Sequence, residues 1–119
     1  VVEDEVLIRI AAADHLRSCG FHVAEAGNAS EAQELVLSGL KIDVVFSDIT
    51  MPGQMDGLAL TQWLHENAPG VPVILTSGVT SSLDTAREVC SNVSAYAPKP
   101  YDYDVLVRQV RDAIAAARS

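Results

Sequence analysis

Short apolar runs alternate along the chain with segments whose apolar residues have helical spacing. Val1-Val2 resembles the end of a strand, and further strand-like runs lie at 21–26, 42–47, 71–76 and 94–97. Turn-forming residues such as Pro69-Gly70 separate the runs from the segments between them. The pattern predicts five strands, and we expect the start of the first strand to precede Val1.

The segments between these runs predict helices, which we place at 5–17, 28–39, 58–67, 81–91 and from Asp102. In the first helix we expect Leu7, Ile10 and Ala11 to face inward. Gly20 is suited to end that helix, and Asn28 is suited to cap the next one. The last helix has the clearest apolar stripe, formed by Leu106, Val110, Ala113, Ile114 and Ala117.

The repeated strand–helix order predicts one α/β domain over residues 1–119, with a parallel sheet. Each crossover between parallel strands needs a helix, and right-handed crossovers place helices on both faces of the sheet. The expected architecture therefore has three layers. In open sheets of this kind the ligand site lies outside the carboxyl ends of the strands.

Composition and charge narrow the possible functions. Hydrophobic residues make up 49% and charged residues 20%, and no run approaches the ~20 apolar residues of a membrane span. The chain has 8 basic and 16 acidic residues, a net charge of −8. This balance argues against direct nucleic-acid binding, which needs clustered basic residues. With two cysteines in no metal-binding pattern, we expect a soluble protein of the cytoplasm.

Polar residues follow the predicted strands and would meet at one edge of the sheet. Glu3 and Asp4 follow the first strand, Asp48 the third, Ser77 the fourth and Lys99 the fifth. Singly, each residue type is common as a helix cap or turn former. Together, crowded carboxylates call for a cation, and an oxygen-only ligand set suits Mg²⁺. The lysine suggests that an anion also binds there, and phosphate is the simplest choice.

Four motifs in this order resemble the receiver domain of two-component response regulators: Glu3-Asp4-Glu5, Asp48 to Gly57, Leu75-Thr76-Ser77-Gly78 and Pro98-Lys99-Pro100. The resemblance extends over essentially the whole chain. It implies a flavodoxin-like, three-layer fold whose five parallel strands have the order 2-1-3-4-5.

The resemblance also implies a phosphorelay chemistry. Asp48 would accept a phosphoryl group from a phosphohistidine on a histidine kinase or a histidine phosphotransfer domain. Asp4 would bind Mg²⁺ directly and Glu3 through a water, while Thr50 would offer its backbone carbonyl. Glu3 stands where the commonest family pattern has Asp. The domain would then be a phosphoacceptor and not an enzyme with a separate substrate.

Three further residues would bind or sense the phosphoryl group. Ser77 and Lys99 match phosphoryl-binding positions, and Tyr96 matches the aromatic residue that follows Ser77 between two rotamers. Tyrosines at 96, 101 and 103 predict an output surface formed by the helix at 81–91, the fifth strand and the last helix. The same surface is a candidate for homodimer contact.

Alternatives remain open from the sequence. The chain could be the receiver portion of a hybrid histidine kinase, whose Leu-Thr-Ser-Gly form it resembles. A flavodoxin-like cofactor binder is a weaker alternative, because no glycine-rich phosphate loop follows the first strand. Gly57 suits a tight turn or a positive φ, although it could simply begin a helix.

Overall fold

The computed structural model describes residues 1–49, 56–77, 93–98 and 102–118; for Ser77, Tyr96, Pro98 and Arg118 it describes the backbone. The helices in this part are α1 (Val6–Ser18), α2 (Ala29–Leu37), α3 (Gly57–Asn67) and α5 (Tyr103–Arg118). The strands are β1 (Val45–Asp48), β2 (Val73–Ser77) and β3 (Val93–Pro98). The helix predicted at 81–91 lies outside the described residues. Within them, no helix has both the length and the apolar character needed to cross a bilayer.

The strands form a parallel sheet in the order β1-β2-β3. Val2 forms one parallel bridge to Ser47 on β1 and another to Ala26 on its other side. The first residues of the chain therefore run beside β1, parallel to it, with the segment at Ala26 beyond them. The predicted α/β class and parallel sheet are confirmed.

Two predicted strands are shorter than expected. Between 21 and 26 only Ala26 forms a bridge, and β1 begins at Val45 although the apolar run begins at Ile42. β1 begins where its pairing with β2 begins, at Val45 and Val73. Beside Ala26, Ala26 N–H donates to the Val1 carbonyl at 2.9 Å, and Glu3 N–H donates to the Ala26 carbonyl at 3.0 Å.

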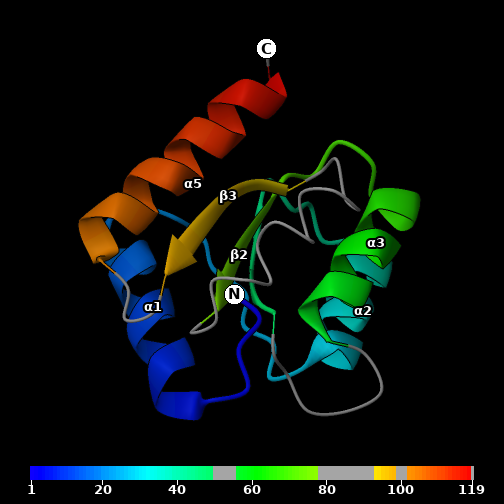
Figure 1. Cartoon of the computed structure of the whole chain (residues 1–119), viewed down its shortest axis with the longest axis horizontal. Coiled ribbons are helices and arrows are strands. Elements are labelled where there is room, and N and C mark those ends of the chain that lie inside the picture. The colour runs from blue at the N-terminus through cyan, green and yellow to red at the C-terminus, as the bar shows by residue number, and fades with distance from the viewer. Residues whose placement is uncertain (50–55, 78–92, 99–101, 119) are drawn as a thin grey trace.

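The sheet separates two apolar cores. Val45, Val73 and Leu75 belong to the core that includes residues of α2 and α3, while Phe46 and Ile74 belong to the core with α1 and α5. Figure 1 shows the two helix pairs on opposite sides of the strands. Successive strand residues alternate between the cores because side chains of a strand point to opposite faces. The sheet is thus covered on both faces, as parallel sheets usually are.

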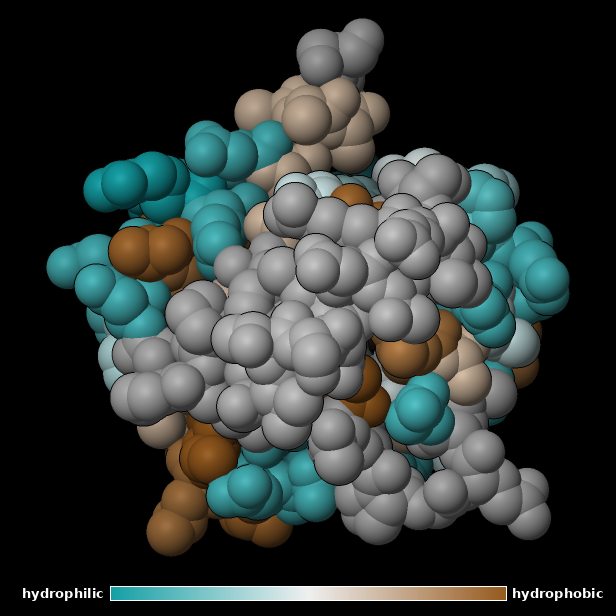
Figure 2. All heavy atoms as spheres, viewed as in Figure 1, coloured by the Kyte–Doolittle hydropathy of each residue, from teal (hydrophilic) through white to brown (hydrophobic). Residues whose placement is uncertain are grey.

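The orientation predicted for α1 is wrong. Leu7 is 83% exposed, Ile10 is 42% exposed and Ala11 is also exposed. The buried residues of this helix are Ala12, Ala13 and Leu16. The helix is apolar around most of its circumference, so spacing alone could not select the inward stripe. Apolar side chains are visible at the surface over the start of α1, at the lower left of Figure 2.

The predicted helix ends agree better with the structure. Gly20 has φ +96° just beyond α1, a conformation that glycine adopts without strain. The Asn28 side chain accepts a hydrogen bond from Glu31 N–H at 2.9 Å and caps α2.

On α5 the predicted stripe is buried at Leu106, Val110 and Ala113, half-buried at Ile114 and exposed at Ala117.

A groove of about 800 Å³ opens beside Val1, at the amino-terminal side of β1. Its walls come from 20–24, 40–46 and the second half of α5, and they include residues of both cores, such as Leu16, Val45, Phe46 and Val110. The Val1 amino group donates to the Ala24 carbonyl at 2.9 Å. Burial lowers the pKa of this amine from 8.0 to about 6, with Glu25 opposing the shift and Arg17 adding to it. The charged amine is therefore poorly solvated there.

Candidate functional site

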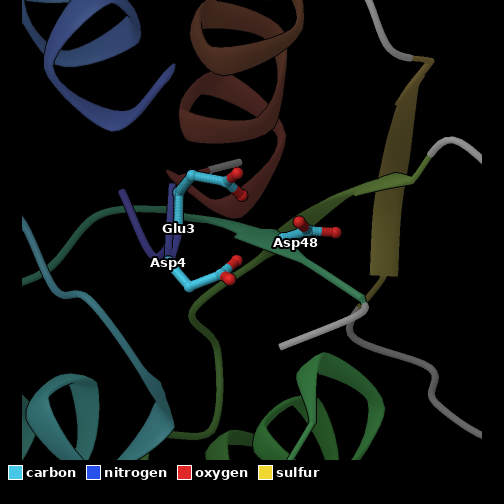
Figure 3. A group of neighbouring side chains, drawn as sticks. All are labelled: Glu3, Asp4 and Asp48. Atoms are coloured by element: carbon cyan, nitrogen blue, oxygen red, sulfur yellow. The ribbon is translucent and has the colours of Figure 1, made fainter. Parts of the chain in front are cut away.

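Three carboxylates meet at the carboxyl end of the sheet. One carboxylate oxygen each from Glu3, Asp4 and Asp48 lies within 4.8 Å of the others. Figure 3 shows the carboxyl groups of Glu3 and Asp4, just before α1, directed towards Asp48 at the end of β1. Glu3 and Asp48 are buried, with exposed fractions of 1% and 4%, and Asp4 is half-buried.

Strand pairing brings these residues together. Val2 and Ser47 are bridge partners, so the residues that follow them, Glu3 and Asp48, lie side by side at the end of the sheet. The Asp48 N–H donates to the Val2 carbonyl at 3.0 Å, which fixes the two segments at this point. The convergence expected from the strand-end rule is therefore found for these three side chains.

Gly57 holds the start of α3 against the end of β1. Its N–H donates to the Ile49 carbonyl at 2.8 Å, and a Cβ at this position would lie 2.0 Å from the Asp48 carbonyl oxygen. The φ of Gly57 is not positive, and Gly57 is the first residue of α3, so the helix start is the alternative that the structure bears out. Glycine is required by the close approach of two backbones. Asp56 caps the helix by accepting from Ala59 N–H at 2.9 Å.

The cluster has the chemistry of a site for a hard cation. Two ionised carboxylates at about 5 Å repel each other by roughly 3 kcal/mol at an effective dielectric constant of about 20. A divalent cation between them would reverse that interaction, and Mg²⁺ prefers carboxylate and other oxygen ligands. The donor set thus fits the cation expected from the sequence, and Glu3, Asp4 and Asp48 could hold a metal ion.

The remaining predicted site residues are described only in part. Thr50 and Lys99 lie outside the described residues. The backbones of Ser77 and Tyr96 lie in β2 and β3, where Ser77 pairs with Pro98 and Tyr96 pairs with Leu75. Ser77 thus ends its strand at the same edge of the sheet as Asp48.

Arg9 contacts the backbone of the cluster, which the sequence pattern did not predict. Its Nη1 donates to the Glu3 carbonyl at 3.1 Å, and its Nε lies 3.5 Å from a carboxylate oxygen of Glu25. One signal was available, since Arg9 is the basic residue nearest to the acidic triplet along the chain. Its partner Glu25 lies on a distant segment, which periodicity does not reveal.

Comparison with known proteins identifies similar sequences. The family model described as response regulator receiver domain matches residues 1–111. The sensor kinase CckA of Brucella abortus (strain 2308) is 31% identical over 94% of this chain. The DNA-binding transcriptional regulator NtrC of Escherichia coli (strain K12) is 37% identical over 96% of it. The chain spans 12% and 24% of the lengths of these two relatives.

Solved structures show the same architecture. The receiver domain of the hybrid histidine kinase CckA aligns with a TM-score of 0.80 and 32% identity, covering 95% of this chain and 94% of that one. NtrX from Brucella abortus aligns with a TM-score of 0.89 and 28% identity, covering 98% of this chain and 26% of that one.

Proposed function

The chain belongs to the response regulator receiver domain family of two-component systems, and from this membership we propose that Asp48 is its phosphoacceptor. The observation that carries the proposal is the meeting of Glu3, Asp4 and Asp48 within 4.8 Å at the carboxyl end of the sheet. Asp48 is the member of this group that ends a central strand, where an open α/β sheet binds its ligand.

The transfer step uses the Asp48 carboxylate as the nucleophile. A carboxylate oxygen attacks the phosphorus of a phosphohistidine on a histidine kinase or a phosphotransfer domain. The phosphorus–nitrogen bond breaks, its electron pair stays on the imidazole nitrogen, and an acyl phosphate forms on Asp48. Glu3 and Asp4 would hold a cation beside Asp48, and that cation would supply the positioning and charge neutralisation that phosphoryl transfer mostly requires.

Mg²⁺ is the proposed cofactor. Asp4 and Asp48 would bind it directly, Glu3 through a water and Thr50 through its backbone carbonyl. When bound, the cation supplies charge neutralisation for the incoming phosphoryl group. With Lys99 at +1 and Mg²⁺ at +2, the charge of the three carboxylates is balanced before that group arrives.

Ser77, Lys99 and Tyr96 complete the proposal. Ser77 and Lys99 would bind phosphoryl oxygens, and Tyr96 would change its rotamer with the state of Ser77. The output surface would be the segment 81–91 together with β3 and α5, and a homodimer would use the same surface. On α5, Tyr103 is half-buried and stacks on His15 at 4.9 Å between ring centroids, so it also joins α5 to α1.

The activity of the whole protein is a separate proposal. Relatives of this chain include a sensor kinase and a DNA-binding regulator, and the chain matches a small part of each. We propose a cytoplasmic phosphoacceptor that catalyses only its own phosphorylation and dephosphorylation and does not bind nucleic acid itself. The receiver portion of a hybrid histidine kinase is the second candidate. A kinase domain or a DNA-binding domain encoded beside this segment would distinguish them.

The complete sheet is proposed to have five strands in the order 2-1-3-4-5. The bridges from Val2 to Ala26 and to Ser47 support the positions of the first two strands.

The phosphoacceptor is tested by labelling with acetyl phosphate. We expect Mg²⁺-dependent phosphorylation, detected by intact-protein mass spectrometry, that disappears in Asp48→Asn. Asp112→Asn is the matched control, because Asp112 is an exposed carboxylate on α5 away from the cluster. Labelling that persists in Asp48→Asn, or that needs no divalent cation, would contradict the proposal.

A further inference from the structure

Arg9 connects the carboxylate cluster to a distant segment of the chain. From the first turns of α1 its Nη1 donates to the Glu3 carbonyl at 3.1 Å. Its Nε faces the Glu25 carboxylate at 3.5 Å, and the side chain is 20% exposed. The guanidinium therefore contacts the backbone that carries Glu3 and Asp4 while an acidic residue holds it from the other side.

The guanidinium also lies against the backbone at Gly27. A Cβ at Gly27 would be 2.9 Å from Arg9 Nη1 and 3.4 Å from a Glu31 carboxylate oxygen. Both neighbours are ends of flexible side chains, and Gly27 has no positive φ. An alanine there is therefore compatible with the backbone but pushes the Arg9 head group from its place.

Arg17 is a natural comparison for Arg9. It pairs with the same Glu25 carboxylate at 3.0 Å, and it donates to the Val23 carbonyl at 2.9 Å. Arg17 is more exposed, at 42%. Both arginines therefore share one acidic partner, while Arg9 donates to the backbone of Glu3 and Arg17 to that of Val23.

We propose that Arg9 is a positioning residue for cation binding by Glu3 and Asp4. By holding the Glu3 carbonyl, it fixes the peptide that joins these two residues and so the directions of their side chains. Mg²⁺ tolerates little departure from octahedral geometry, so small movements of its ligands reduce affinity. The inference rests on the proposed function, because it assumes that the cluster binds Mg²⁺.

Two variants test the position of the guanidinium without removing its charge. Arg9→Lys keeps the cation but lacks the planar fork that reaches Glu3 and Glu25 together. Gly27→Ala keeps Arg9 itself and displaces its head group. We expect each to weaken Mg²⁺ binding about tenfold in calorimetric titration, the lower end of the effect of groups that orient metal ligands.

Arg17→Lys is the matched control and should bind Mg²⁺ as the unaltered chain does. The ¹³C chemical shift of the Glu3 carbonyl, measured without metal, gives a second readout that general destabilisation does not move. It should change in Arg9→Lys and Gly27→Ala and stay constant in Arg17→Lys.

The outcomes separate the two proposals. If the unaltered chain neither binds Mg²⁺ nor is phosphorylated on Asp48, the proposed function fails. If it does both, and Arg9→Lys and Gly27→Ala bind Mg²⁺ with unchanged affinity, the role of Arg9 is overturned while the proposed function stands.

Discussion

The segment Val1 to Asp4 has two ends with opposite properties. At its carboxyl end, Glu3 and Asp4 meet Asp48 within 4.8 Å, and Gly57 leaves no space for even one Cβ beside the Asp48 carbonyl. At its amino end a groove of about 800 Å³ surrounds Val1, whose amine is poorly solvated. The carboxyl end brings together three acidic side chains, and the amino end borders a largely apolar groove.

The difference teaches that, within Val1 to Asp4, one end is suited to bind a cation and the other mainly affects the stability of the fold. A cation would relieve the carboxylates with little change in packing. Additional apolar residues would fill the groove with little change in charge. Changes at the amino end should therefore affect mainly the free energy of unfolding, and changes to the carboxylates of Glu3, Asp4 and Asp48 should affect mainly cation affinity.

The largest expected effect comes from filling the groove. An extension of about four alternating Val and Ile residues before Val1 should raise the free energy of unfolding by about 4 kcal/mol. Each buried side chain contributes about 1.5 to 3 kcal/mol, partly offset by about 1 to 2 kcal/mol per residue of backbone ordering. Urea denaturation measures the change. A Gly-Ser extension of equal length is the control, and equal stabilisation by both would contradict the role of the groove.

The next effect tests the close packing at the other end. Gly57→Ala should lower the free energy of unfolding by about 3 kcal/mol, because its Cβ would overlap the Asp48 carbonyl. Gly39→Ala serves as the control. Its Cβ would meet nothing within 4 Å, and only its φ of +87° opposes alanine, so a cost of about 1 kcal/mol is expected. Equal losses in the two variants would argue against the close approach.

The pH dependence of a chain that starts at Val1 should follow its amine. Because burial lowers the pKa of the amine from 8.0 to about 6, the unfolded chain binds more protons between these values. The free energy of unfolding should therefore rise by about 2 kcal/mol from pH 6 to pH 8. Acetylating the amine is the control and should remove this part of the slope. Glu25 and Arg17 stay in place in both forms.

The smallest effect on stability is expected at Glu3. Without Mg²⁺, Glu3→Gln should change the free energy of unfolding by about 1 kcal/mol or less, because the buried side chain keeps its size while it loses one charge. The same change should weaken Mg²⁺ binding about tenfold. Glu5→Gln alters an exposed neighbour and should leave both quantities unchanged. A loss of stability together with unchanged Mg²⁺ affinity in Glu3→Gln would break the separation between the two ends.

Much of the site could be predicted from the sequence, because it depends only on which residues follow the strands of a parallel sheet. Glu3, Asp4 and Asp48 each follow a strand-like run, and parallel strands end at the same edge of their sheet. The caps at Gly20 and Asn28 follow from local backbone chemistry. These features need only local sequence and a parallel sheet.

Features that depend on distant contacts could not be predicted in this way. The inward side of α1 is set by its packing, since apolar residues occur around most of the helix. Glycine at position 57 is explained by the distance to the Asp48 carbonyl, not by φ. Arg9 is held by Glu25 and by the Glu3 carbonyl. Glu25 is remote from Arg9 in sequence, and a backbone acceptor leaves no mark in the residue pattern.

The groove also suggests a way to measure cation binding by the carboxylate cluster with a second ligand. A short apolar peptide supplied in trans could bind in the groove beside Val1, as split reporter proteins are reassembled from fragments. Its binding site continues directly into Glu3 and Asp4, so peptide and cation would act on one segment. Any coupling between the two ligands is reciprocal. If Mg²⁺ changes the affinity for the peptide by some factor, the peptide changes the affinity for Mg²⁺ by the same factor. The fluorescence of a labelled peptide would thus report cation binding at the opposite end of the sheet.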